Sequence, residues 1–143
     1  MVDLDHFKSV NDAYGHLCGD AVLQEAAKIM QACLCPYDGV GRYRGEEFLI
    51  IVPRSDAAAA LGVAERIHKE IASKPIATPS GEVRVTASFG VTASAEATPV
   101  ELQQLLQMAD DALFRAKQNG RNRSELANVS SPLKVTPLAS NSQ

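Results

Sequence analysis

Two close pairs of carboxylates are the residues of this sequence best suited to do chemistry. Asp3 and Asp5 are separated by one apolar residue, and Glu46 and Glu47 are adjacent in a polar turn between two apolar runs. If the first pair lies on a strand, alternation puts both of its side chains on one face. Carboxylate oxygens are hard ligands that suit Mg²⁺ or Mn²⁺ better than zinc. The pairs therefore favour a divalent metal site, and charges solvated in a turn are the simpler alternative.

Only one acid of the second pair can extend toward the ions from a regular strand, because successive side chains alternate between the two faces. We expect it to be Glu46, which lies at the turn. Lys8, Lys117 and Arg121 supply the positive charge that a triphosphate needs. For Lys117 and Arg121, a favourable interaction with the C-terminal end of a helix is also enough to explain the charge. Acids and cations together fit nucleotidyl transfer with two metal ions.

Hydrophobic periodicity and turn residues predict the elements that position these side chains. Strands are expected over residues 1–5, 39–43, 48–52, 74–78 and 82–91, and residues 6–15 are expected to be a polar, partly helical connection. Helices are expected to start at Gly19-Asp20, at Ser55-Asp56 and at a capping box over residues 98–101, with Leu102 on the buried face of the last helix and Asn119-Gly120 at its end. Interleaved strands and helices predict an α+β fold with helices packed on a sheet.

Length and composition indicate one globular domain, with 143 residues of which 45% are hydrophobic. The net charge of −3 gives no basic footprint for binding a nucleic-acid polymer. No apolar run approaches the length of a membrane span, and no signal peptide precedes the first strand. The three cysteines lack metal-ligand spacing and fit reduced thiols in a cytoplasmic protein. Residues 128–143 are rich in Ser, Pro, Asn and Gln and are expected to be a disordered tail or linker.

Several motifs, in a fixed order, carry a resemblance to a known family. They are Asp3-Leu4-Asp5-His6-Phe7-Lys8-Ser9-Val10-Asn11-Asp12, Tyr14-Gly15-His16, Gly19-Asp20, Arg42-Tyr43-Arg44-Gly45-Glu46-Glu47-Phe48, Ser88-Phe89-Gly90-Val91, Ala109-Asp110 and Ala116-Lys117-Gln118-Asn119-Gly120-Arg121-Asn122. Over Met1 to about Ala127 the sequence resembles the GGDEF family of diguanylate cyclases. The resemblance implies a palm-like nucleotidyl cyclase fold of ferredoxin-like type, whose central, mostly antiparallel sheet is flanked by helices. It also implies condensation of two GTP into cyclic di-GMP and two pyrophosphates.

The resemblance assigns metal binding and catalysis to residues of the two acidic pairs. Asp3, Glu46 and the carbonyl of Leu4 match positions that hold Mg²⁺ or Mn²⁺, two ions per GTP site. Glu47 is the second acid of the family signature, with a role as metal ligand or as general base. Arg42 matches a position that steadies the transferring phosphate.

The resemblance assigns GTP binding to a second set of residues. Asn11 and Asp20 match positions that read the guanine edge, which is chemically sensible because a carboxylate accepts from the guanine N1–H and N2–H donors. Taken alone, Asp20 is equally well explained as a helix N-cap. Lys8, Lys117 and Arg121 match phosphate contacts, and Lys8 belongs to the catalytic set as well.

Two departures from the family pattern keep a second interpretation open. Arg44 stands where the signature has its first glycine, a residue that lets backbone approach a nucleotide closely. The sequence also starts inside a strand, without the helix that precedes it in the family. The main interpretation is an active diguanylate cyclase domain over residues 1–127. The alternatives are a degenerate domain that binds GTP, cyclic di-GMP or a partner protein, and another nucleotidyl cyclase of the same fold.

The resemblance also bears on regulation and partners. Many family members carry an inhibitory Arg-x-x-Asp site, but here Cys35 replaces the arginine while Asp38 remains. Arg66 is the candidate for a secondary contact to the product. We expect catalysis in a homodimer, with a sensory or regulatory domain attached on the N-terminal side. The expected location is the cytoplasm, either free or as the cytoplasmic domain of a larger, membrane-attached protein.

Overall fold

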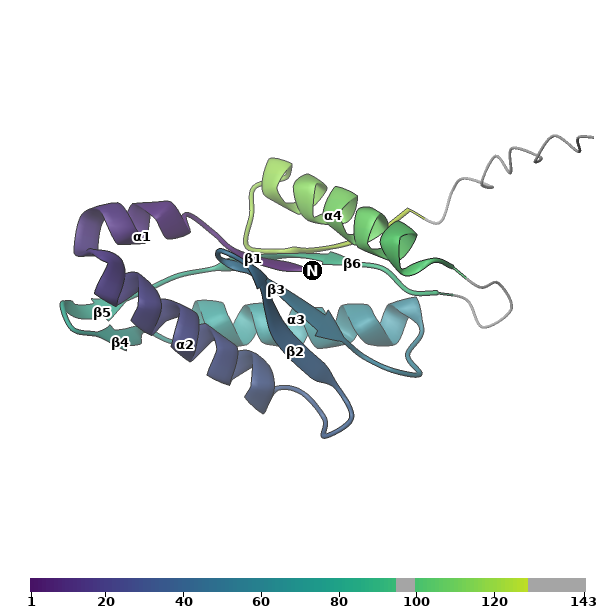
Figure 1. Cartoon of the computed structure of the whole chain (residues 1–143), viewed down its shortest axis with the longest axis horizontal. Coiled ribbons are helices and arrows are strands. Elements are labelled where there is room, and N and C mark those ends of the chain that lie inside the picture. The colour runs from purple at the N-terminus through teal and green to yellow at the C-terminus, as the bar shows by residue number, and fades with distance from the viewer. Residues whose placement is uncertain (95–99, 129–143) are drawn as a thin grey trace, which may run out of the picture.

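A five-stranded sheet forms the centre of the protein, with the strand order β2-β3-β1-β6-β7 (Figure 1). The computed structural model describes residues 1–94 and 100–128. The strands of this sheet are β1 (Val2–Leu4), β2 (Gly39–Arg44), β3 (Glu47–Ile51), β6 (Ala87–Val91) and β7 (Ser124–Leu126). All neighbouring pairs are antiparallel except β6 and β7, which are parallel. The predicted α+β fold with a mostly antiparallel sheet is confirmed.

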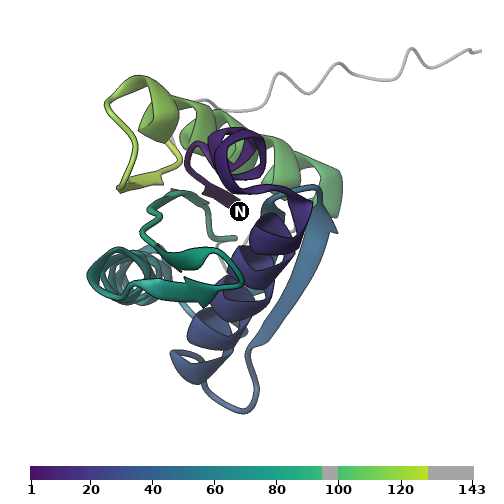
Figure 2. The ribbon, with the colours of Figure 1, turned by 90° about the vertical axis from the view of Figure 1, so that its left-hand side faces the viewer.

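Four helices and a small hairpin complete the described part of the chain. The helices are α1 (Phe7–Tyr14), α2 (His16–Ala32), α3 (Ala57–Ser73) and α4 (Leu102–Gln118), and the hairpin consists of β4 (Ile76–Thr78) and β5 (Gly81–Val83). Helix α4 covers one face of the sheet, while α2 and α3 cover the other (Figures 1 and 2). None of the helices in the described ranges is both long and apolar enough to cross a bilayer.

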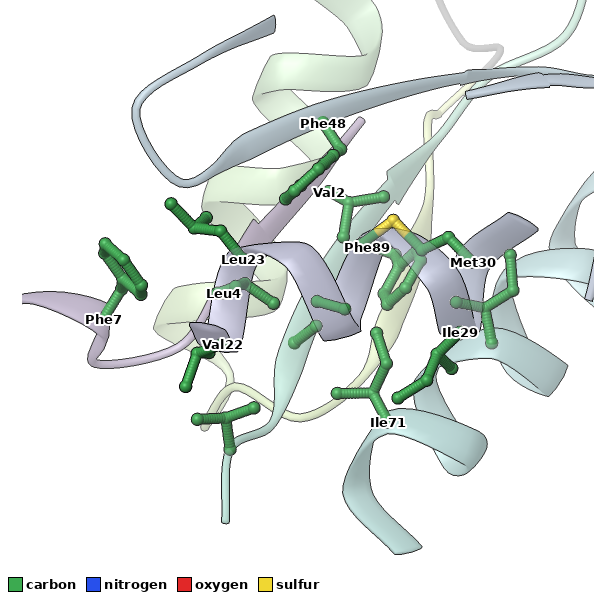
Figure 3. Packing of buried hydrophobic residues seen from close by; sticks show 14 of the residues in the cluster. Val2, Leu4, Phe7, Val22, Leu23, Ile29, Met30, Phe48, Ile71 and Phe89 are labelled. Carbon is green, nitrogen blue, oxygen red and sulfur yellow. The ribbon is translucent and has the colours of Figure 1, made fainter. Parts of the chain in front are cut away.

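The short central strand β1 divides its side chains between the two layers. Val2 and Leu4 are buried in the main core with Phe89 and side chains of α2 and α3 (Figure 3). Met1 packs on the other face with Ala109 of α4. Because side chains alternate along a strand, Asp3 is directed to the α4 side; β1 ends at Leu4, so the predicted strand does not extend to Asp5.

Close packing of α4 on β6 brings the C-terminal end of this helix toward the acids. A Cβ atom added at Gly90 would lie 2.0 Å from the carbonyl oxygen of Ala109 and 2.4 Å from the backbone nitrogen of Leu113. Since no side chain fits between them, a glycine at this position lets the helix backbone rest directly on the strand. Lys117 lies at the end of the same helix, and it reaches Asp3.

Two of the predicted helix starts are wrong, and one is confirmed. Helix α2 begins at His16, so Asp20 lies within its first turns and is not an N-cap. Helix α4 begins at Leu102 with Glu101 at the N-cap position and no side-chain cap, which contradicts the predicted capping box; Thr98 and Pro99 lie outside the described residues. Asp56 caps α3 as predicted, accepting a hydrogen bond from the backbone nitrogen of Ala59 at 2.8 Å.

Leu102 is also not on a buried face, because 68% of it is exposed at the very start of α4. Farther along the helix the predicted apolar face is confirmed, since Ala109, Ala112, Leu113 and Ala116 are buried. The predicted helix end is confirmed as well. Its C-cap residue is Asn119, followed by Gly120 with a positive φ of 114°.

The predicted strand over residues 82–91 is in fact two strands that belong to different sheets. β5 pairs only with β4, and the chain joins the central sheet at Ala87. Thr86, between them, accepts a hydrogen bond from the backbone nitrogen of Asp5 at 2.9 Å. Simple alternation of buried residues through both strands hid this break. Strand β7 was not predicted from the sequence. The expected tail over residues 128–143 lies almost wholly in residues 129–143, outside the described residues.

Candidate active site

The β2–β3 hairpin carries the family signature at its tip, as predicted. Gly45 and Glu46 form the turn between the strands, and the register shifts between Arg42 and Arg44. Arg42 Nε donates to the carbonyl of Gly45 at 2.7 Å, and Arg44 Nε donates to Glu47 Oε2 at 2.5 Å. Both arginines therefore hold the tip in shape, and Arg44 also pairs with one of the two acids.

Three acidic residues are neighbours along the backbone at the β1 end of the hairpin, and one lysine reaches the first of them. Asp3 is opposite Glu47 in the β1–β3 register, and the backbone nitrogen of Leu4 donates to the carbonyl of Glu46 at 3.3 Å. Lys117 Nζ donates to Asp3 Oδ2 at 2.7 Å. We call the group Asp3, Glu46, Glu47 and Lys117 the acidic centre.

The environment of Asp3 disfavours its negative charge. Only 6% of the residue is exposed, and this burial is the main cause that raises the pKa of its carboxyl above the ordinary value. The hydrogen bond and charge of Lys117 act in the opposite direction, while the charges of Glu46 and Glu47 raise the pKa further. A carboxylate that is buried among like charges gains from a nearby cation, and the ammonium of Lys117 already fills that need in part.

The donor atoms of the acidic centre fit a hard divalent cation. Asp3 precedes Leu4 in β1, and the backbone nitrogen of Leu4 is hydrogen-bonded to the backbone carbonyl of Glu46. The carboxylates of Asp3 and Glu46 and the carbonyl of Leu4 all offer oxygen, the ligand atom that Mg²⁺ and Mn²⁺ prefer. Among the described residues no group of three acidic, histidine or cysteine side chains is gathered as a metal site. The predicted metal set includes a third carboxylate, that of Glu47, and the structure does not gather the three side chains into such a group. The assignment of these residues to metal binding therefore stays a prediction.

Asn11 of α1 packs against Gly19 of α2, the residue that precedes Asp20. A Cβ atom added at Gly19 would lie 1.8 Å from Asn11 Oδ1, so the glycine leaves the space that the amide group occupies. Asp20 follows directly and is exposed near the start of α2. The two predicted guanine contacts therefore lie on adjoining helix surfaces, and the N-cap explanation for Asp20 does not apply.

The remaining predicted phosphate contacts are less tightly placed. Lys8, in the first turn of α1, is exposed, and Arg121 is exposed just beyond the end of α4. Within residues 1–94 and 100–128, neither forms an ion pair with the acidic centre, in contrast to Lys117. Of the predicted cations, Lys117 is the one that the structure joins to the acids.

Asp5 was grouped with the other acids in the sequence, but the structure gives it different partners. Its carboxylate accepts hydrogen bonds from Ser88 Oγ at 2.7 Å, from Thr86 Oγ1 at 2.6 Å and from the backbone nitrogen of Asn122 at 3.0 Å. Spacing alone could not separate it from Asp3. The hydroxyl residues at 86 and 88 were the available signal, because they lie on the neighbouring strand and the residue leading into it.

The remnant of the inhibitory motif is engaged in local contacts. Asp38 Oδ2 accepts a hydrogen bond from the backbone nitrogen of Cys35 at 2.9 Å, which closes the turn between α2 and β2. Arg66 Nη2, on α3, donates to the carbonyl of Cys33 at 2.6 Å. Both side chains stabilise the end of α2 in this structure.

Comparison with known proteins agrees with this arrangement. A family profile described as "Diguanylate cyclase, GGDEF domain" matches residues 1–123. The chain belongs to the GGDEF family. It is 42% identical over 132 residues to diguanylate cyclase A of Treponema denticola. The aligned region covers 92% of this chain and 35% of that relative. The chain thus spans about a third of the length of that curated relative.

Solved structures of GGDEF proteins share the fold. The diguanylate cyclase SiaD of Pseudomonas aeruginosa, solved with its activator SiaC, matches with a TM-score of 0.82 and 38% identity, covering 88% of this chain and 48% of SiaD. The GGDEF domain of DgcB from Caulobacter crescentus, solved with c-di-GMP, matches with a TM-score of 0.81 and 32% identity, covering 88% of this chain and 74% of that one.

Proposed function

We propose that this chain is the catalytic domain of a diguanylate cyclase, which condenses two GTP into cyclic di-GMP and two pyrophosphates. The observation that carries the proposal is the acidic centre, where Asp3 is buried beside Glu46 and Glu47 and is paired with Lys117. The placement of Asn11 against Gly19, next to Asp20, adds a surface suited to guanine. Family membership and the c-di-GMP complex of DgcB support the same assignment.

In the proposed reaction the 3′-hydroxyl oxygen of one GTP forms a bond to the α-phosphorus of the other. The bond from that phosphorus to the bridging oxygen breaks, pyrophosphate leaves, and the hydroxyl proton is released; a second, identical step closes the ring. Two bound Mg²⁺ or Mn²⁺ ions would polarise the phosphate and stabilise the charge of the attacking and leaving oxygens. Asp3, Glu46 and the Leu4 carbonyl would hold them.

The cations of the chain would orient the triphosphate. Lys117 would exchange part of its contact with Asp3 for a phosphate oxygen when metal neutralises the acids, since an ammonium binds phosphate as a compact charge. Lys8 and Arg121 would contact the outer phosphates. Arg42 would steady the transferring phosphate from the hairpin, where its Nε already anchors the turn through the carbonyl of Gly45.

Glu47 is better suited to the metal side of the reaction than to proton removal. One of its oxygens already accepts a hydrogen bond from Arg44, so it is a poorer acceptor for the hydroxyl proton. It lies opposite Asp3 in the sheet, where its charge adds to the attraction for cations. We therefore propose that Glu47 either binds a metal ion directly or adds negative charge that attracts the ions.

Two domains are required for this chemistry. The motifs describe one GTP site in each domain, and each hydroxyl must reach the α-phosphate of the other GTP. A two-fold symmetric homodimer satisfies both conditions, because the same surface then serves each partner. We further propose that the unit extends over residues 1–127 and works in the cytoplasm under an N-terminal sensory or regulatory domain.

One observation favours a second candidate function, in which the domain binds GTP or cyclic di-GMP but catalyses no reaction. Arg44 replaces the first glycine of the signature and engages Glu47, so one acid is partly neutralised. The test is to incubate the purified chain with GTP and Mg²⁺ and to separate the nucleotides by chromatography. Cyclic di-GMP with two pyrophosphates supports the enzyme; GTP binding without product, in wild type and in Arg44→Gly alike, supports the binding domain.

A further inference from the structure

Asp5 lies two residues beyond Asp3, but its carboxylate is already fully engaged. One oxygen accepts from Ser88, and the other accepts from both Thr86 and the backbone of Asn122. Only 5% of the residue is exposed. Proteins tolerate a buried carboxylate when hydrogen-bond donors surround it in this way. The carboxylate of Asp5 therefore has a structural environment in which its hydrogen bonds are satisfied by the protein.

The segment that Asp5 contacts has an unfavourable backbone conformation. Helix α4 ends with hydrogen bonds from the nitrogen of Arg121 to the carbonyl of Ala116 at 2.9 Å and from the nitrogen of Gly120 to the carbonyl of Lys117 at 3.5 Å, the pattern of a Schellman motif. Arg121 and Asn122 then have φ angles of 62° and 46°. Two successive left-handed residues with a Cβ atom persist only when surrounding contacts hold them.

We propose that Asp5 is a positioning residue that holds the Arg121-Asn122 turn, and that it is not a metal ligand. This inference rests on the proposed function, because Arg121 is there a phosphate contact. By fixing the N–H of Asn122, Asp5 sets the direction of the backbone at Arg121. It also ties the end of β1, which carries Asp3, to the end of α4, which carries Lys117.

A role as metal ligand would require Asp5 to give up these contacts. Hydroxyl groups can rotate, but the N–H of Asn122 is fixed by its backbone and donates to Oδ2. A cation at Oδ2 would therefore face a hydrogen-bond donor at short range. Asp3 has no such backbone donor among its described side-chain contacts, and its partner is the flexible ammonium of Lys117.

The two roles predict different responses to Asp5→Asn. An asparagine can keep its oxygen toward Asn122 and turn its amide toward Ser88, whose hydroxyl can accept as well as donate. The turn would then survive the loss of charge. An alanine offers no acceptor, so Asp5→Ala leaves the N–H of Asn122 without its partner.

The experiment measures kcat and KM for GTP in wild type, D5N, D5A and D3N, with thermal melting and amide exchange of the Asn122 N–H by NMR. For D5A we expect KM to rise about tenfold, with a smaller change in kcat and faster exchange at Asn122. For D5N we expect KM within about threefold of wild type. D3N should instead lose kcat. A folded D5A with unchanged KM, or a D5N as inactive as D3N, would overturn the proposal.

A double variant covers the case in which D5A does not fold. T86V/S88A removes the two hydroxyl donors and keeps the carboxylate, and we expect faster exchange at Asn122 with a KM raised about threefold. Unchanged values of both would overturn the proposal. If wild type makes no cyclic di-GMP, the proposed function fails separately, and the dissociation constant for GTP from calorimetry replaces KM in the same comparison.

Discussion

Asp3 in the acidic centre and Asp38 in the turn before β2 are both carboxylates of family motifs, but their hydrogen-bond partners differ. In the acidic centre, Asp3 is buried near the charges of Glu46 and Glu47 and accepts a hydrogen bond from the ammonium of Lys117. In the turn before β2, Asp38 accepts from the backbone of Cys35, and Arg66 donates to a backbone carbonyl. The carboxylate of Asp3 therefore gains from a ligand, whereas that of Asp38 is satisfied by its own chain.

The two regions lead to different expectations for binding. A buried acid among like charges stores a preference for cations, which a metal or a substrate complex can use. A side chain that closes a turn would have to break a hydrogen bond before it could bind anything. We therefore expect strong effects of substitution in the acidic centre and weak ones at Asp38.

The largest effect is expected for Glu46→Gln. It keeps the shape of the side chain but removes the charge of a proposed metal ligand, and the loss in kcat should exceed about 100-fold, more than is typical for residues that only support a ligand. Glu82→Gln, in the exposed part of β5, is the matched control and should keep its rate. Turnover of Glu46→Gln near that of the control, with Mg²⁺ present, would contradict the metal assignment.

A smaller effect is expected when Asp20 and Asp56 are each replaced by alanine. Asp20→Ala removes the proposed guanine acceptor, and the preference for GTP over ATP should fall about tenfold, within the roughly 1–3 kcal/mol of an unpaired buried donor. Asp56→Ala removes a true N-cap and should lower the unfolding free energy by about 1 kcal/mol without changing that preference. Competition binding and thermal melting measure both. A loss of stability in Asp20→Ala with an unchanged preference for GTP would contradict the guanine assignment and leave Asp20 a structural role within α2.

The pKa of Asp3 predicts a modest dependence of stability on pH. Because the folded-state pKa is raised above the ordinary value of 3.8, the folded protein binds more protons than the unfolded chain between the two values. Without divalent metal, the unfolding free energy of wild type minus that of Asp3→Asn should therefore fall as pH rises through this window. Urea titrations of both proteins at several pH values measure it. A difference that rises with pH would show that the pKa is lowered instead.

The smallest effect is expected at the turn before β2. Cys35 cannot make the charge-assisted, bidentate contacts of the usual arginine, so cyclic di-GMP should inhibit only by competing for the GTP site. Asp38→Ala should leave the inhibition constant within about twofold, since only a turn contact is lost. Titration of cyclic di-GMP at several GTP concentrations decides this. Inhibition that persists at saturating GTP and disappears in Asp38→Ala would show that Asp38 takes part in product binding and does more than close the turn.

Much of this arrangement could be predicted from the sequence because the signals were local. The hairpin followed from its turn and flanking apolar runs, and the cap at Asp56 from its position before a periodic segment. The alternation of buried Val2 and Leu4 with Asp3 followed from the period of a strand. The family motifs supplied the roles of Asp3, Glu46 and Lys117, of which the structure brings Lys117 onto Asp3.

One failure was a local misplacement of a helix start, and the others depended on contacts between distant segments. Asp20 resembled an N-cap, but α2 begins earlier at His16. Residues 82–91 alternate like one strand, yet Thr86 is drawn to Asp5 and splits them. Asp3 and Asp5 differ in their hydrogen-bond partners, because Lys117 contacts the first and Asn122 the second. Both partners are more than a hundred positions away in the chain.

The most direct test of the proposed function is to incubate the wild-type chain with GTP and Mg²⁺ at a series of protein concentrations and to quantify the nucleotides. We predict one cyclic di-GMP for every two pyrophosphates, with specific activity that rises with protein concentration until dimers predominate. Folded, GTP-binding protein that forms no cyclic di-GMP at any concentration would contradict it.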